Sequence, residues 1–95
     1  MSEENNLDIT IDILSRDRIG LMAEITSDIS TFNAEIIKYR AKVFTDNKSR
    51  KMSKCRVNVS VGDQELRSLL GRLSKKSGVV SVAPVYGEYQ FVRGT

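Results

Sequence analysis

The chain has 95 residues, is 40% hydrophobic and carries a formal net charge of +3, with one cysteine and no histidine. This length suits one domain whose core needs no metal or disulfide. The absence of histidine excludes imidazole-based catalysis and the usual zinc sites. Nothing in the sequence resembles a signal peptide or a membrane-spanning run. We therefore expect a cytoplasmic domain with no metal, no cofactor and no membrane partner.

The first predicted strand and the first predicted helix meet at a turn over residues 15–21. Apolar and polar residues alternate over 7–13, which predicts a half-buried strand. Apolar residues recur at helical spacing over 21–32, which predicts one face of an amphipathic helix. The period changes inside the turn, where we expect Asp17 to cap the helix and Gly20 to lie in its first turn.

Gly20 has a structural and a functional interpretation. A glycine early in a helix costs roughly 1 kcal/mol relative to alanine, so its presence requires a reason. The turn could need a positive φ, or a neighbouring strand could pack too closely for a Cβ. Alternatively, the missing Cβ lets a ligand approach amides that a helix start leaves unpaired. The residues alone favour the structural interpretation.

Two further strands are predicted after this helix. Asn33 suits the left-handed position that ends a helix. Residues 37–43 then alternate between apolar and basic side chains, and residues 54–61 repeat that pattern. The intervening segment, 45–51, is polar and too long for a two-residue hairpin turn. Both strands should therefore have one apolar face and one mostly basic face.

The second predicted helix covers residues 63–76, with Asp63 as its expected cap and an apolar stripe of leucines. A short strand follows over 79–83. Pro84 cannot donate a backbone hydrogen bond, so this strand should lie at a sheet edge or end there.

The domain boundaries follow from the same patterns. Residues 1–6 are polar and are expected to form a loose leader, residues 7–86 the domain, and residues 87–95 a tail. The aromatic segment from residue 86 onward could add a strand, cover an edge or pack on a partner, and its role stays open. The sequence also leaves open whether the chain is complete or an excised domain.

The element order is strand-helix-strand-strand-helix-strand. Right-handed crossovers predict an α+β, ferredoxin-like βαββαβ sandwich, with a four-stranded antiparallel sheet and two helices on one face. This fold supports many functions. The predicted core consists of the inward-facing apolar residues Ile9, Ile11, Ile13, Leu21, Ile25, Ile29, Ile37, Tyr39, Val43, Cys55, Val57, Val59, Leu66, Leu69, Leu70, Leu73 and Val82.

The residues give little support for catalysis by this domain. Cys55 has the parity of the core and is interpreted as a packing residue. Asp8 and Asp12 share the outer face of the first strand but lie roughly 13 Å apart, too far for a carboxylate pair. The sequence has no glycine-rich phosphate loop. We expect no catalytic residue in this domain.

Positive charge is concentrated in residues 36–60, which carry +7, whereas the remainder carries −4. A basic sheet face could bind RNA phosphates, although Phe44 is the one stacking aromatic available there. The alternative, which the residues favour, is a solvated face partly neutralised by Asp8 and Asp12. The candidate RNA-binding residues are Lys38, Arg40, Lys42, Arg50, Lys51, Lys54 and Arg56.

The turn also carries a family resemblance. Residues 17–26 resemble the Asp-Arg-x-Gly-Leu-Leu-x-Asp/Glu-Ile-Thr signature of ACT domains. Residues 33–36 stand where that family has Asn-x-x-Ile, and residues 78–82 where it has Gly-Val-x-x-Val. The resemblance runs over residues 8–85. The Glu-Ile-Thr continuation most resembles the C-terminal ACT domain of RelA/SpoT-type GTP pyrophosphokinases, which make and hydrolyse guanosine tetraphosphate in the stringent response.

This resemblance implies a regulatory role, with the catalytic centres of the parent pyrophosphokinase in other domains. It implies a homodimer paired side by side and a small amino acid, branched-chain favoured, bound at the pairing interface. In the RelA/SpoT relatives, it also implies sensing of the ribosome and its tRNA. Ile19 stands where many members have proline, which makes the turn less rigid. The implied ligand-binding residues are Asp17, Arg18, Ile19, Gly20, Leu21, Asn33 and Ile36.

Two other functions stay open at this point. One is a stand-alone amino-acid-binding ACT protein of another pathway. The other is an RNA-contacting module that uses the basic sheet face.

Overall fold

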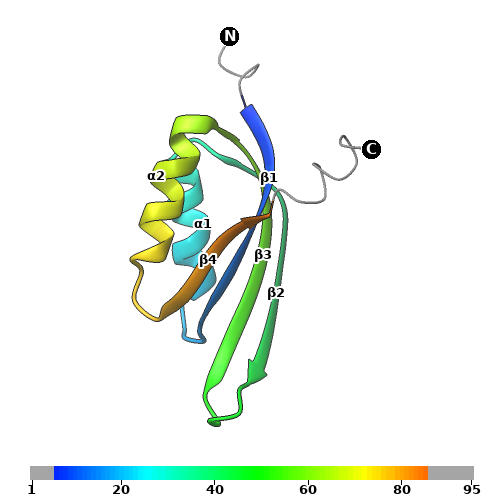
Figure 1. The fold of residues 1–95 in the computed structure, drawn as a ribbon, viewed down its shortest axis with the longest axis vertical. Coiled ribbons are helices and arrows are strands. Elements are labelled where there is room, and N and C mark those ends of the chain that lie inside the picture. The colour runs from blue at the N-terminus through cyan, green and yellow to red at the C-terminus, as the bar shows by residue number, and fades with distance from the viewer. Residues whose placement is uncertain (1–5, 86–95) are drawn as a thin grey trace.

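The computed structural model describes residues 6–85, so residues 1–5 of the predicted leader, the last residue of the predicted domain (86) and the predicted tail (87–95) lie outside the described residues. The first strand begins at Asn6, which the sequence analysis counted with the leader. The elements, shown in Figure 1, are β1 (Asn6–Arg16), α1 (Leu21–Thr31), β2 (Glu35–Thr45), β3 (Lys51–Gly62), α2 (Asp63–Ser74) and β4 (Val79–Val85).

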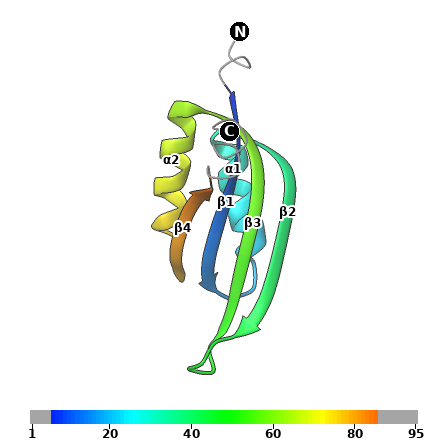
Figure 2. The same cartoon turned by 45° about the vertical axis from the view of Figure 1, so that its right-hand side comes forward.

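The strands form one antiparallel sheet in the order β2-β3-β1-β4, and both helices cover the same face of it (Figures 1 and 2). The predicted ferredoxin-like fold is confirmed. β4 is an edge strand and Pro84 lies opposite Ile11 near its end, as the missing backbone donor of proline requires. β2 forms the other edge.

The core lies between the helices and the two central strands. Most predicted core residues are buried, but Ile37 and Val43 are 53% and 51% exposed, so their assignment to the core was wrong. The pairing of β2 with β3 shifts between Ile36 and Lys38, which leaves Ile37 as an extra residue in β2. No residue of β2 is buried, because this strand lies at the edge of the sheet.

The helix starts differ from the predicted ones. Gly20, not Asp17, is the N-cap of α1, and Gly62 precedes α2, so that Asp63 is its first residue. Neither helix has a side-chain cap hydrogen bond. Asp63 still places negative charge in the first turn of α2, where the helix dipole favours it. Asn33 has a φ of 60°, which confirms its left-handed position after α1.

Cys55 is 1% exposed and is a free thiol in the core, so its assignment as a packing residue is confirmed. Burial raises the pKa of this thiol, which keeps it protonated and unreactive. Across residues 6–85, neither helix is long and apolar enough to cross a bilayer. The same residues hold no group of three or more His, Cys, Asp or Glu side chains suited to a metal ion.

Candidate functional site

The turn between β1 and α1 is fixed to two neighbouring segments. The Arg16 amide donates to the Gly78 carbonyl at 2.8 Å, which ties the turn to the segment between α2 and β4. The Asp17 amide donates to the Lys51 carbonyl at 2.9 Å, which ties it to the start of β3. The hydroxyl of Ser15 also donates to the Gly78 carbonyl, at 3.2 Å. The base of the turn is therefore rigid, and residues 18–20 connect it to the helix.

Gly20 is left-handed, with a φ of 84°. A Cβ built on this residue meets no atom within 4 Å. Of the two structural reasons for glycine, the positive φ therefore applies and the close approach of a strand does not. The open space also leaves the helix start accessible, as the functional interpretation requires.

Two amides at the start of α1, those of Met22 and Ala23, have no hydrogen-bond acceptor among the described residues. The neighbouring amides are used, because Leu21 donates to the Arg18 carbonyl at 3.3 Å and Glu24 donates to the Gly20 carbonyl at 3.0 Å. Unpaired amides at a helix N-terminus, together with the positive end of the helix dipole, favour an anionic group.

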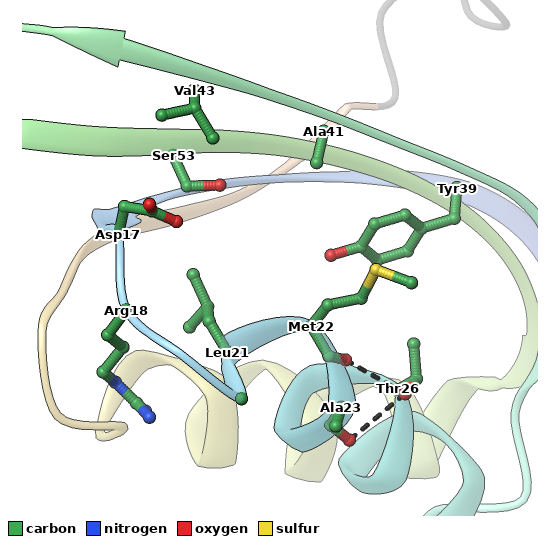
Figure 3. A pocket seen from close by; sticks show the side chains of 11 residues that line it. Asp17, Arg18, Leu21, Met22, Ala23, Thr26, Tyr39, Ala41, Val43 and Ser53 are labelled. Atoms are coloured by element: carbon green, nitrogen blue, oxygen red, sulfur yellow. Dashed lines mark hydrogen bonds between the residues drawn. The ribbon is translucent and has the colours of Figure 1, made fainter.

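An open groove of about 600 Å³ lies between this helix start and β2. This volume is in the range of small-molecule sites. Figure 3 shows Met22 of α1 and Tyr39 of β2 directed toward each other across the groove. The lining residues are Asp17, Arg18, Gly20, Leu21, Met22, Ala23, Thr26, Tyr39, Ala41, Val43 and Ser53.

The polar groups of the groove differ in their availability. The Asp17 carboxylate forms no ion pair or hydrogen bond with another residue of the segment 6–85. The Thr26 hydroxyl already donates to helix carbonyls. The Tyr39 side chain is partly buried against the core. Desolvation raises the pKa of Tyr39, so this phenol stays neutral. Asp17 is therefore the group best suited to meet a cationic ligand atom.

The structure brings together four of the seven residues implied by the family resemblance: Asp17, Arg18, Gly20 and Leu21 all line the groove. Ile19 is fully exposed at the turn and does not line it. The other two, Asn33 and Ile36, follow the opposite end of α1, whose 11 residues span about 16 Å.

Sequence reasoning missed the walls of the groove, which are formed by Met22, Tyr39, Ala41, Val43 and Ser53. Strand periodicity placed the three β2 residues on one face, but it assigned two of them to the core. The exposure of Val43 follows from the edge position of β2, and Met22 is 60% exposed because it lies outside the apolar stripe of α1.

The basic residues gather on the sheet face opposite the helices. Arg40 lies opposite Arg56, and Lys42 lies opposite Lys54, so like charges meet on neighbouring strands. Arg56 also forms an ion pair with Asp12 at 2.7 Å, which lowers the pKa of that carboxyl. We define the outer basic face as Lys38, Arg40, Lys42, Lys54 and Arg56.

The two loop residues predicted to join this face have other environments. Arg50 pairs with Asp46 at 2.8 Å within the β2–β3 loop. Lys51 begins β3, and its carbonyl accepts the Asp17 amide. The hydrogen bonds of Arg50 lower the pKa of Asp46 and neutralise much of the loop charge.

The sheet, its helix layer and the groove define a ferredoxin-like domain with a candidate small-molecule site at the first strand-to-helix turn. The chain belongs to the ACT domain family, whose model matches residues 3–83. The family predicted from the turn motif is thus confirmed. ACT domains are regulatory and not catalytic, so regulation is the function class of this domain.

Solved structures support the same fold. The ACT domain from GTP pyrophosphokinase of Chlorobium tepidum has a TM-score of 0.68 and 23% identity, covering 84% of this chain and 99% of that chain. The C-terminal domain of the MgtC protein from Mycobacterium tuberculosis has a TM-score of 0.69 and 18% identity, covering 90% and 93%. A homoserine dehydrogenase from Thiobacillus denitrificans has a TM-score of 0.62 and 10% identity, covering 90% of this chain and 18% of that chain. No match was found among curated proteins.

Proposed function

We propose that this domain senses an amino acid and thereby regulates the catalytic domains of a cytoplasmic GTP pyrophosphokinase. The observation that carries the proposal is the groove that joins unpaired helix amides, a free carboxylate and an apolar wall. The signature at the turn and the similarity to the pyrophosphokinase ACT domain of C. tepidum support the choice of parent enzyme. A stand-alone amino-acid-binding protein is the alternative.

The groove matches the three parts of an amino acid. The α-carboxylate would accept hydrogen bonds from the Met22 and Ala23 amides at the positive end of α1. The α-ammonium group would pair with Asp17. An aliphatic side chain would lie against Met22, Tyr39 and Val43, where it leaves no polar group unsatisfied. These contacts favour a branched-chain amino acid.

Pairing of two copies would complete this site. β2 is an edge strand, and Ile36, Ile37 and Val43 along it are exposed. An unpaired apolar edge is a natural surface for strand pairing with a second chain. A side-by-side homodimer through β2 would place the partner next to the open side of the groove and exclude water from it.

Isothermal titration of the domain with a panel of amino acids tests the ligand. We expect a branched-chain amino acid to bind, and Asp17→Asn to weaken binding by about tenfold through loss of a charge-assisted hydrogen bond. Asp63→Asn is the matched control, because this carboxylate lies at the start of α2 and does not line the groove. Absence of binding across the panel at millimolar ligand would remove the amino-acid part of the proposal.

RNA contact through the outer basic face is a second candidate function. It is favoured by the like-charged pairs between β2 and β3, which collect positive charge at some cost in stability. The test reverses Lys38, Arg40 and Lys54 to Glu and measures affinity for a structured RNA, such as a tRNA, over a range of salt concentrations. Unchanged affinity and salt dependence would exclude this surface.

A further inference from the structure

A network of ion pairs joins the turn to both helices. Its five members, named here the α1–α2 network, are Arg18, Glu24, Asp28, Arg72 and Lys76. The Arg18 guanidinium donates two hydrogen bonds of 2.8 Å to the Glu24 carboxylate. Lys76 lies 3.6 Å from Glu24 and 2.9 Å from Asp28, and Arg72 lies 3.7 Å from Asp28.

Arg18 is held away from the apolar part of the groove by this arrangement. Figure 3 shows its side chain directed away from the sheet and from Tyr39. Its Nε is shielded from solvent and has no hydrogen-bond acceptor among residues 6–85. The two bonds to Glu24 are therefore the hydrogen bonds that fix the guanidinium. Since both terminal nitrogens of the guanidinium donate to one carboxylate, the positive charge of Arg18 is balanced before any ligand arrives.

The pair also acts on the backbone of the turn. The Arg18 carbonyl accepts the Leu21 amide, and the Gly20 carbonyl accepts the Glu24 amide. Glu24 is thus bonded to the turn through both its side chain and its main chain. Lys76 anchors Glu24 from the segment before β4, because it also pairs with Asp28, which is 6% exposed. Loss of the Glu24 carboxylate would therefore allow residues 18–20 to shift relative to the first amides of α1.

We propose that Glu24 is a positioning residue that holds Arg18 on α1, so that main-chain amides, and not Arg18, recognise the carboxylate of a bound amino acid. This inference rests on the proposed function of the groove. In this arrangement Arg18 and Glu24 pair with each other. The charged groups of the ligand are then recognised by the first amides of α1 and by Asp17.

The experiment compares Arg18→Met, Glu24→Gln and the double variant with wild type. Arg67→Met is the matched control, because it removes an exposed arginine that lies 3.9 Å from Asp63 on α2. Amide spectra of the free proteins report the turn through Gly20, Leu21 and Met22. Titrations with L-valine, L-leucine and L-isoleucine then report affinity.

We expect both single variants to shift the three turn amides, and the double variant to shift them no further. Each single variant should weaken binding by about threefold to fivefold, again without an added loss in the double variant. The inference is overturned if Arg18→Met weakens binding while Glu24→Gln leaves it unchanged or strengthens it, because Arg18 would then contact the ligand. It is also overturned if Glu24→Gln moves the turn amides no more than Arg67→Met does.

Failure of the proposed function gives a different result. If wild type binds none of the three amino acids, the ligand part of the proposed function is wrong. The spectra of the free proteins still decide whether Glu24 positions the turn.

Discussion

Gly20 is the residue at which the turn is most sensitive to substitution. Gly20→Ala should destabilise the fold by about 1 to 2 kcal/mol, because alanine is strained at a φ of 84°. Gly71→Ala is the control, since Gly71 lies within α2, has open space around it and should gain about 0.5 to 1 kcal/mol. Urea unfolding of the three proteins measures both changes. A similar gain for both variants would show that the turn tolerates a side chain.

Glu24 makes stability depend on acid pH. Hydrogen bonds from Arg18, with a smaller effect of Lys76, lower the pKa of Glu24 from 4.5 to about 2. A carboxyl with a lowered pKa stabilises the folded state above its unfolded pKa, and this contribution is lost as pH falls through the folded value. The loss therefore occurs between about pH 4.5 and pH 2.

Glu24→Gln should weaken the pH dependence of the unfolding free energy in this window. Some dependence should remain, because the pKa values of Asp12 and Asp46 are also lowered in the folded state. Urea midpoints measured from pH 5 to about pH 2 test this expectation. A variant with the same pH profile as wild type would contradict it.

The residues at the two ends of α1 show which local features the sequence could predict and which it could not. Aspartate is a common helix cap, but the Asp17 amide donates a hydrogen bond to the Lys51 carbonyl. Asp17 therefore extends the pairing of β1 with β3 and does not cap the helix. The N-cap of α1 is instead Gly20, a residue type that ranks below aspartate at this position. Which residue caps α1 thus depends on β3, which is distant in the sequence. Asn33 was predicted correctly because its left-handed φ satisfies a purely local requirement.

β2 is the element that most affects the candidate site. Its alternation predicted a strand with one apolar face, and that strand is present. The shift near Ile37 could not be predicted, because it exists only relative to the pairing with β3. The sequence also did not show that β2 lies at the edge of the sheet. Of the β2 residues assigned to the core, Tyr39 and Val43 therefore line the groove, and Ile37 is exposed at the sheet edge.

The proposed pairing through the β2 edge gives a prediction at this scale. If the homodimer forms through β2, Ile37→Lys should shift the protein from dimer to monomer without unfolding it, because Ile37 is 53% exposed and packs in no core. Val80→Lys is the matched control on the opposite edge strand, where Val80 is 62% exposed. Light scattering after size-exclusion chromatography measures the mass of each. Dissociation by Val80→Lys and not by Ile37→Lys would move the interface to β4.

For the whole molecule, the fold was predictable and the groove was not. The periods of four strands and two helices, with their order, suffice to define the sheet and the helix layer, since each period reports which face of an element is buried. The groove is formed by residues of the turn, α1, β2 and β3. Its shape depends on the distance between a helix and an edge strand, which no periodicity encodes.

The outer basic face makes a prediction about the charge of the whole molecule. Lys42→Glu replaces a like-charged pair with an opposite-charged one, since Lys42 lies directly opposite Lys54. We expect a gain in stability of about 0.5 kcal/mol at low salt, which screening should remove at about 1 M salt. If the face binds RNA, the same variant should also lower RNA affinity and reduce its dependence on salt.

Lys48→Glu separates the face from net charge. It changes the net charge by the same amount, but Lys48 lies in the β2–β3 loop and faces no residue of a neighbouring strand. A loss of RNA affinity with Lys42→Glu alone would assign binding to the outer basic face. Equal losses in both variants would instead indicate attraction to net charge, because a non-specific polyanion responds to the field of the molecule and not to one arrangement of side chains. The stability gain of Lys42→Glu should persist in either case, since it depends only on the pairing between β2 and β3.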